Sequence, residues 1–165
     1  MTISEGKTLP DARLLRIANN GPEWVELAPR LKGRKVVIFG LPGAYTGTCT
    51  TAHVPSFIRT KTDFEKKGVD GIICIAVNDP FVLKAWSDQT GAAKAGITTL
   101  GDAESAFTTA IGMNFTAPPV GFVKMVRTRH QAFVLCAMLH REHVAGFVHR
   151  DLQSSGQQAV GCVVP

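Results

Sequence analysis

Hydrophobic and polar residues alternate near the start of the chain in a way that predicts three strands. Residues 12–18 and 23–27 are short, partly apolar runs separated by the turn-forming residues 19–22, Asn-Asn-Gly-Pro, which is typical of two paired strands. Residues 34–41, RKVVIFGL, form a nearly continuous apolar run. Such a run is typical of a strand in the buried middle of a sheet.

A helical pattern follows over residues 48–67. Apolar residues recur there at intervals of about three or four positions, and Gly68 stands where a helix commonly ends. Pro55 lies inside this segment. Because proline has no backbone N–H, we expect the helix to be kinked near its start.

The rest of the chain continues the alternation of strands and helices. Residues 69–79 predict a second buried strand, and either Asn78 or Asp79 caps a helix that begins at Pro80. The later elements are a strand over 96–102, a short helix over 103–113 introduced by Asp102, and strands over 120–126, 131–139 and 142–150, the last two forming a hairpin.

This order of elements predicts an α/β fold with three layers, in which helices cover both faces of a sheet. The chain has 165 residues, a length suited to one domain with one core. We therefore expect a single domain over residues 1–165. The pattern fades after Asp151.

Composition and charge exclude several classes of protein. The net charge is +5, but the 18 basic residues are scattered, so binding to nucleic acid is not supported. No apolar run approaches the roughly 20 residues that cross a membrane. Glu5 and Asp11 stand near the start, where neither a secretory signal nor an Arg-rich transit peptide is recognisable. We expect a soluble, cytoplasmic protein.

The four cysteines are spread along the chain, at Cys49, Cys74, Cys136 and Cys162. No C-x-x-C pair occurs, so neither a structural zinc site nor a general thiol–disulfide oxidoreductase is indicated. Cys136, in the run FVLCAML, reads as a core residue. Cysteines of cytosolic proteins are usually reduced, so a functional cysteine here is expected to act through the reactivity of its thiol.

Cys49 stands where a strand gives way to a helix. Free N–H groups and the positive end of the helix dipole stabilise a thiolate there, and can lower its pKa from about 8.5 into the range of roughly 3.5–7.5. Thr46 is placed to hydrogen-bond to the sulfur, and Pro42 to shield it. Gly43 and Gly47 let the backbone approach closely.

The stretch PGAYTGTC resembles the P-x-x-x-T/S-x-x-C loop of the peroxiredoxins, and VVIFGLPGAYTGTCTTAHVPSF is similar to the type II, or type 5, class in particular. GVDGIICIAVNDPFVLKAW and GKTLPDARL are similar to it as well. The resemblance extends over about residues 5–126. It implies a thioredoxin-like sandwich with a central mixed sheet between helices and an N-terminal β-hairpin.

The resemblance also implies a thiol peroxidase. Cys49 matches the cysteine that attacks hydrogen peroxide or an alkyl hydroperoxide and becomes a sulfenic acid, and Thr46 matches the residue that holds the peroxide. Backbone N–H groups near Gly43, Thr48 and Cys49 stabilise the developing charge. No metal or organic cofactor is implied. Thioredoxin, glutaredoxin or a glutathione-like thiol regenerates the enzyme, and a homodimer is expected.

The sequence departs from the family in places. Tyr45 replaces a phenylalanine and Gly47 a proline, which loosens the loop. The family's arginine aligns with His130, while Arg129 follows from a shift of one residue and Arg127 is a further option. We favour Arg129. Residues 127–165 diverge from the family, whose final helix is not recognisable here.

Two questions remain open in the sequence. Cys74 and Cys162 are both candidates for a resolving cysteine, although a mechanism with one cysteine and an external thiol is the simplest expectation. His53 lies on the helical face of Cys49 and is expected to pack or hydrogen-bond near the site rather than to bind a metal.

The uncertain position of the arginine also permits an alternative function, a weakly active family member that serves as a binding or chaperone-like protein.

Overall fold

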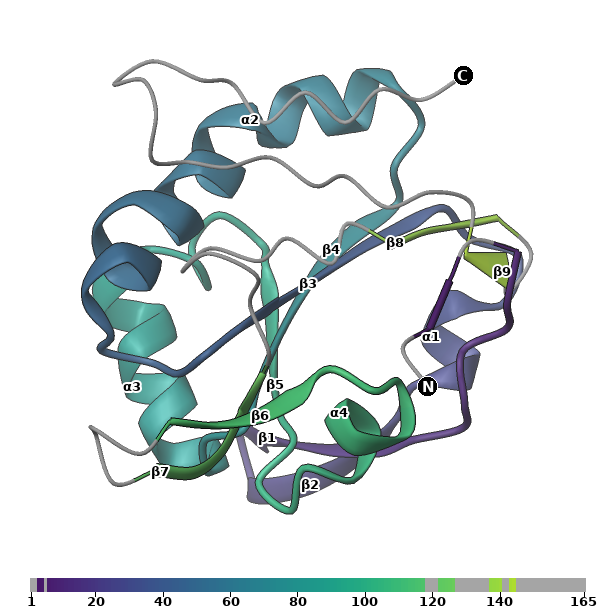
Figure 1. Ribbon diagram of the computed structural model, residues 1–165. Helices are drawn as coiled ribbons and strands as arrows, with labels where there is room; N and C mark the ends of the chain where they lie inside the picture. The colour runs from purple at the N-terminus through teal and green to yellow at the C-terminus, as the bar shows by residue number, and fades with distance from the viewer. Residues whose placement is uncertain (1–2, 5, 118–121, 127–136, 141–142, 145–165) are drawn as a thin grey trace.

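The computed structural model describes residues 3–4, 6–117, 122–126, 137–140 and 143–144, and its core is a mixed sheet (Figure 1). Seven strands make this sheet, in the order β2-β1-β5-β4-β3-β8-β9. Their bounds are β1 Arg13–Ala18, β2 Gly21–Glu26, β3 Val36–Leu41, β4 Gly71–Ala76, β5 Thr98–Gly101, β8 Ala137–His140 and β9 His143–Val144.

The centre of the sheet is parallel, and its margins are antiparallel. β4 runs parallel to both β3 and β5, with Phe39 opposite Cys74, whereas β1 pairs antiparallel with β2 and β5, and β8 with β3 and β9. The hairpin and the buried strands predicted in the first part of the chain are therefore confirmed. The predicted hairpin near His140 is present in its described part.

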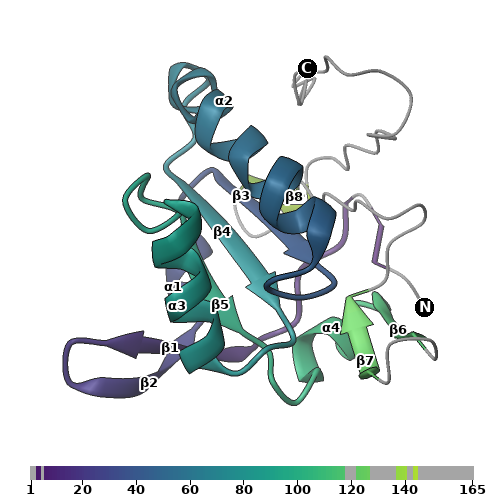
Figure 2. The same ribbon diagram turned by 90° about the vertical axis from the view of Figure 1, so that its left-hand side faces the viewer.

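Helices cover both faces of the sheet (Figure 2). Since successive strand residues point to opposite faces, Val37, Phe39 and Leu41 of β3 enter one core, together with residues of α2 (Val54–Lys66) and α3 (Pro80–Thr90). Val36 and Ile38 enter the other core, with residues of α1 (Ala28–Leu31) and α4 (Ala106–Ala110). The three predicted layers are confirmed.

The helix that follows β3 begins with a wide turn. Gly47 and Thr48 are already helical, Cys49–His53 form a π-helical turn, and the Val54 N–H donates to the Cys49 carbonyl. Pro55, at the start of α2, explains this turn. It lacks an N–H, and in a regular α-helix its ring would collide with the carbonyl four residues before it. The predicted kink is thus a turn with an extra residue.

Acidic side chains hold the starts of α3 and α4. The Asp79 carboxylate accepts hydrogen bonds from the Phe81 and Val82 N–H groups, so Asp79 rather than Asn78 is the cap. The Asp102 carboxylate accepts from the Phe107 and Thr108 N–H groups, at 3.2 and 2.7 Å, as the predicted introduction to the short helix requires.

Two short elements were not predicted, α1 and the strand β6 (Asn114–Ala117), which pairs with β7 (Phe122–Val126) in a separate two-stranded sheet. β7 itself falls within the strand predicted over residues 120–126. Most of the strands predicted over 131–139 and 142–150 lies outside the described residues. Within the described part of the chain, no helix has the length and apolar character needed to cross a membrane.

Candidate active site

Cys49 lies in the first turn of the helix that follows β3, as the sequence predicted. β3 ends at Leu41, a loop over residues 42–46 follows, and the helix starts at Gly47. The Cys49 side chain is only 2% exposed and belongs to the core between the sheet and the helices α2 and α3. Cys49 is a free thiol.

Hydrogen bonds connect the residues of the loop and of the helix start near the sulfur. The Thr46 hydroxyl donates to the Gly43 carbonyl at 2.7 Å, and the Thr50 N–H donates to the Thr46 carbonyl at 3.1 Å. The Thr46 side chain and the Gly43 backbone also hydrogen-bond to Cys49. The structure thus brings together Cys49, Thr46 and Gly43, as expected from the sequence.

The surroundings of Cys49 in the described residues raise the pKa of its thiol, whereas the sequence predicted a lowered pKa. Burial raises the pKa of the Cys49 thiol, because the charged form loses water, while hydrogen bonds from Thr46, Gly43 and its own backbone lower it. The burial effect is the largest. The helix start alone therefore does not give the low pKa that we expected for Cys49.

The other residues of the loop and of the helix start have different surroundings. Pro42 is half-buried, and Thr48 is exposed. Among the residues that the structure describes, a Cβ atom on Gly47 would meet nothing within 4 Å, and one on Gly43 would lie 3.4 Å from the Asn78 Oδ1. The close backbone approach predicted for both glycines is therefore wrong for Gly47, and Gly43 has only ordinary contacts.

Two residues that sequence analysis did not assign to the site contact this segment. The Asn78 Oδ1 accepts a hydrogen bond from the Ala44 N–H at 2.8 Å, and the Trp86 Nε1 donates to the Thr50 Oγ1 at 3.0 Å. The sequence pointed to Asn78 only as a possible helix cap.

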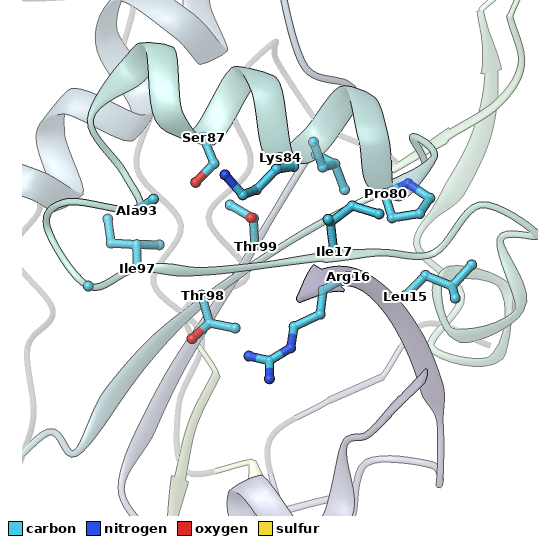
Figure 3. A pocket seen from close by; sticks show the side chains of 12 residues that line it. Leu15, Arg16, Ile17, Pro80, Lys84, Ser87, Ala93, Ile97, Thr98 and Thr99 are labelled. Atoms are coloured by element: carbon cyan, nitrogen blue, oxygen red, sulfur yellow. The ribbon is translucent and has the colours of Figure 1, made fainter. Parts of the chain in front are cut away.

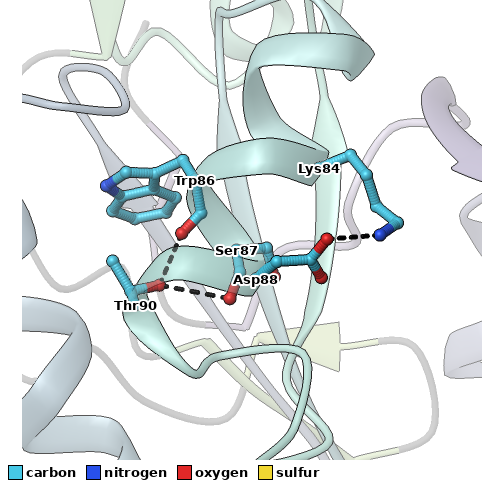
Figure 4. Close-up of polar contacts among 5 residues, drawn as sticks. All are labelled: Lys84, Trp86, Ser87, Asp88 and Thr90. Carbon is cyan, nitrogen blue, oxygen red and sulfur yellow. Dashed lines mark hydrogen bonds and ion pairs between the residues drawn. The ribbon is translucent and has the colours of Figure 1, made fainter.

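The helix that carries Trp86 is braced by polar contacts of its own (Figure 4). The Thr90 hydroxyl donates to the Trp86 and Ser87 carbonyls, at 2.8 and 3.4 Å, and Lys84 forms an ion pair with Asp88. These contacts fix the last turn of α3 and with it the backbone of Trp86.

Cys74 lies on β4, on the same side of the sheet as Cys49. It is 1% exposed, and burial, with a smaller effect from the charge of Cys49, raises the pKa of Cys74. Cys74 therefore shares the enclosed core in which Cys49 lies. Cys74 is nevertheless an inert thiol as long as the sheet interior stays closed.

His53 is fully buried between aromatic rings. Its ring centre lies 5.4 Å from that of Phe39 and 5.6 Å from that of Phe57. Burial lowers the pKa of His53 to about 4, and neither ring nitrogen has a hydrogen-bond partner among the described residues. The expected packing role is supported, since His53 behaves here as a neutral aromatic group.

A groove elsewhere on the molecule takes no part in this site. It lies between β1, β5 and α3 (Figure 3), and Ser87, Lys84 and Thr98 are among the residues that line it. The predicted residues Arg127, Arg129, His130, Cys136 and Cys162 lie outside the described part of the chain. Within that part, no three His, Cys, Asp or Glu side chains form a group that could hold a metal.

The fold and the sequence are similar to those of known proteins. Residues 4–135 match the Redoxin family model. Peroxiredoxin-2E-2, chloroplastic, of Oryza sativa subsp. japonica is 39% identical over 137 residues, which are 81% of this chain and 60% of that protein. Peroxiredoxin-2D of Arabidopsis thaliana is 34% identical over 134 residues, which are 81% of each chain.

A solved structure is similar over nearly its whole length. The crystal structure of reduced Prx3 in complex with H2O2, from Vibrio vulnificus, has a TM-score of 0.80 and 30% identity, and the match covers 93% of this chain and 92% of that one. The chain belongs to the redoxin family, as a peroxiredoxin of the type II (type 5) class. The expected thioredoxin-like fold is confirmed. The chain spans less than two thirds of the rice relative's length, at 60%.

The low pKa of His53 predicts that folding stability falls in mild acid. The unfolded chain binds a proton near His53's ordinary pKa of 6.5, whereas the folded chain does so only near pH 4. This contribution is therefore complete above pH 6.5 and is lost as the pH falls toward 4. We expect a loss of about 3 kcal/mol, measured by denaturant unfolding at pH 7 and pH 4.

His53→Leu is the control, because it removes the titrating group and keeps an apolar side chain. The variant should lose less stability than wild type over the same pH interval. An equal loss in both proteins would show that other groups cause the acid sensitivity.

Proposed function

We propose that this protein is a thiol-dependent peroxidase that reduces hydrogen peroxide and alkyl hydroperoxides at Cys49. The observation that carries this proposal is a buried free thiol in the first turn of a helix, with Thr46 and the Gly43 backbone hydrogen-bonded to it. The similar Vibrio vulnificus protein, which was crystallised with H2O2, supports the choice of substrate.

In the proposed reaction, the Cys49 thiolate attacks one oxygen of the peroxide. A sulfur–oxygen bond forms as the O–O bond breaks, the sulfur is oxidised to a sulfenic acid, and the departing oxygen takes a proton and leaves as water or an alcohol. Thr46 holds the peroxide, Pro42 limits access of water, and N–H groups near Gly43 and Thr48 stabilise the developing charge. No metal or organic cofactor takes part.

An external thiol then restores the enzyme. It attacks the Cys49 sulfenic acid, releases water and forms a mixed disulfide, and a second thiol reduces that disulfide to free Cys49. Thioredoxin, glutaredoxin and glutathione-like compounds all have this chemistry. Cys74 shares the core cluster of Cys49 and is a candidate for the resolving thiol, but its burial in a central strand favours the external thiol. Cys162 is the other candidate for this role.

The alternative, a weakly active binding or chaperone-like protein, is not favoured. The peroxiredoxins to which the chain is similar support the enzymatic function. We also propose that the chain is one domain with a divergent part over residues 127–165, and that it works in the cytoplasm. The rice relative is chloroplastic, so imaging of a fluorescent fusion decides the compartment.

Substitution of the two described cysteines tests the mechanism. Cys49→Ser should lower peroxide consumption by about two orders of magnitude or more, because the nucleophile is lost. Cys74→Ser should keep the rate within about twofold, because an external thiol resolves the sulfenic acid. Peroxide consumption with a thioredoxin system and labelling of sulfenic acid with dimedone measure the two steps. Equal slow rates in wild type and Cys49→Ser would refute the peroxidase function.

A positive charge from Arg129 is proposed to offset the effect of burial on Cys49. An arginine beside a thiolate favours the charged form, so Arg129→Gln should raise the pKa of Cys49 by about one or more and slow the peroxide reaction roughly tenfold at neutral pH. The pH dependence of Cys49 alkylation measures the pKa. Arg127→Gln and His130→Gln are the matched comparisons, and a larger effect in either one would move the role to that residue.

We propose that the protein forms a homodimer through the side that carries the active-site loop. Tyr45 and Phe81 are large apolar side chains that are 53% and 63% exposed. Phe81 lies in the first turn of α3, three residues after Asn78, which contacts the loop. Exposed apolar groups of this kind mark interfaces when they lie together.

Phe81→Glu should therefore shift the protein from dimer to monomer in sedimentation velocity at micromolar concentration, because a charge is costly in an apolar interface. Trp24→Glu is the control, since Trp24 is also exposed, at 51%, but lies on the hairpin strand β2. A monomeric wild type, or dissociation by Trp24→Glu alone, would contradict the proposed interface.

A further inference from the structure

We propose that Asn78 is a positioning residue for the reaction at Cys49, because its side chain fixes the orientation of the peptide group between Gly43 and Ala44. This inference rests on the proposed peroxidase function. Asn78 lies 29 residues after Cys49 in the chain, just beyond the end of β4 and before the cap of α3.

Both polar groups of that peptide are hydrogen-bonded, and each has a different partner. Its N–H, on Ala44, donates to the Asn78 Oδ1 at 2.8 Å, and its C=O, on Gly43, accepts from the Thr46 hydroxyl at 2.7 Å. The peptide is trans, so the N–H and C=O point in opposite directions. Asn78 and Thr46 therefore hold the peptide group from its two sides.

The orientation of this peptide decides where the Thr46 hydroxyl points. A hydroxyl has one proton to donate and two lone pairs that accept. The Gly43 carbonyl and the Cys49 sulfur both accept from this one hydroxyl, so the Thr46 O–H is held between them and its lone pairs are left to accept from a peroxide. If the peptide rotated, its carbonyl would face the Asn78 Oδ1, so that two acceptors would oppose each other, and Thr46 would lose its acceptor.

The backbone of Asn78 packs against the sheet and lies next to the cap of α3. Its carbonyl oxygen would lie 2.8 Å from a Cβ atom on Gly101, much closer than such an atom tolerates, so β5 packs directly against the Asn78 backbone. The next residue, Asp79, caps α3 with two hydrogen bonds. The loop is therefore hydrogen-bonded to a residue that packs against β5 and directly precedes the cap of α3.

The side chain must accept a hydrogen bond without adding charge. An amide oxygen does this, whereas a carboxylate would also accept from Ala44 but would bring a negative charge toward the Cys49 thiolate. Since a like charge disfavours ionisation, aspartate at position 78 should keep the loop in place and raise the pKa of Cys49. This difference separates positioning from charge.

The test compares wild type with Asn78→Ala, Asn78→Asp and Ser87→Ala. Ser87 is a matched control, because it also lies in the β4–α3 segment but lines the groove beside β1 and β5, and its hydroxyl has no partner among the described residues. Three readouts are needed: the peroxide rate constant of fully ionised Cys49, the iodoacetamide rate constant of the same thiolate, and hydrogen exchange of the Ala44 amide.

Asn78→Ala should slow the peroxide reaction of the thiolate about tenfold and speed exchange of the Ala44 amide about tenfold, the effect of one lost hydrogen bond. Alkylation needs no oriented hydroxyl and should change by less than about twofold. Asn78→Asp should restore the peroxide rate constant of the thiolate to within about threefold while raising the pKa of Cys49. Ser87→Ala should match wild type in all three readouts.

The inference is overturned if Asn78→Ala slows peroxide reaction and alkylation by the same factor, if Ala44 exchange is unchanged, or if Asn78→Asp gives no rescue. Failure of the proposed function gives a different pattern. Wild type would then react with peroxide no faster than Cys49→Ser, while Ala44 exchange still responds to Asn78→Ala. That result would refute the proposed peroxidase function, and it would still show that Asn78 fixes the conformation of the loop.

Discussion

The ionisation of one buried sulfur is the constraint on which this site depends. Cys49 lies in the core, where loss of water raises its pKa, and the hydrogen bonds from Thr46 and the Gly43 backbone act against that effect. Enclosure excludes water and strengthens each remaining electrostatic interaction. The same enclosure makes the thiolate costly, and a positive charge such as that of the proposed arginine would offset this cost.

The fold serves this site by fixing two ends of a short loop. β3 and β4 are parallel neighbours, so the loop after β3 and the turn after β4 emerge at the same edge of the sheet. Asn78 connects that turn to the loop, and Trp86 connects α3 to Thr50 just after Cys49. The segment that carries the nucleophile is thus bound on both sides by one strand–helix unit.

Much of this architecture could be predicted from the sequence, and what could not has physical reasons. The apolar runs that became β3 and β4 are long and clear, whereas α1 and β6 are four residues each and too short to show a period. Asn78 and Asp79 are both good caps, so only the fold could show that Asp79 caps α3 and that Asn78 turns to the loop.

The position of Cys49 was predicted correctly, whereas the effect of burial on its pKa was not foreseen. A helix start is visible in a sequence, and the depth to which packing buries it is not, so the dominant effect on the thiol was missed. The candidates for the arginine lie beyond residue 126, where the resemblance read from the sequence motifs ended and where the structure does not describe them.

The wide turn before α2 has a consequence of a different kind. Its cause is the pyrrolidine ring of Pro55, a covalent feature that does not depend on temperature, salt or the oxidation state of the sulfur. Side-chain contacts around Cys49 can loosen, and the main chain behind it would still be unable to relax into a regular helix. A regular α-helical connection between Cys49 and α2 is therefore excluded by covalent structure, whichever side-chain contacts are present around the sulfur.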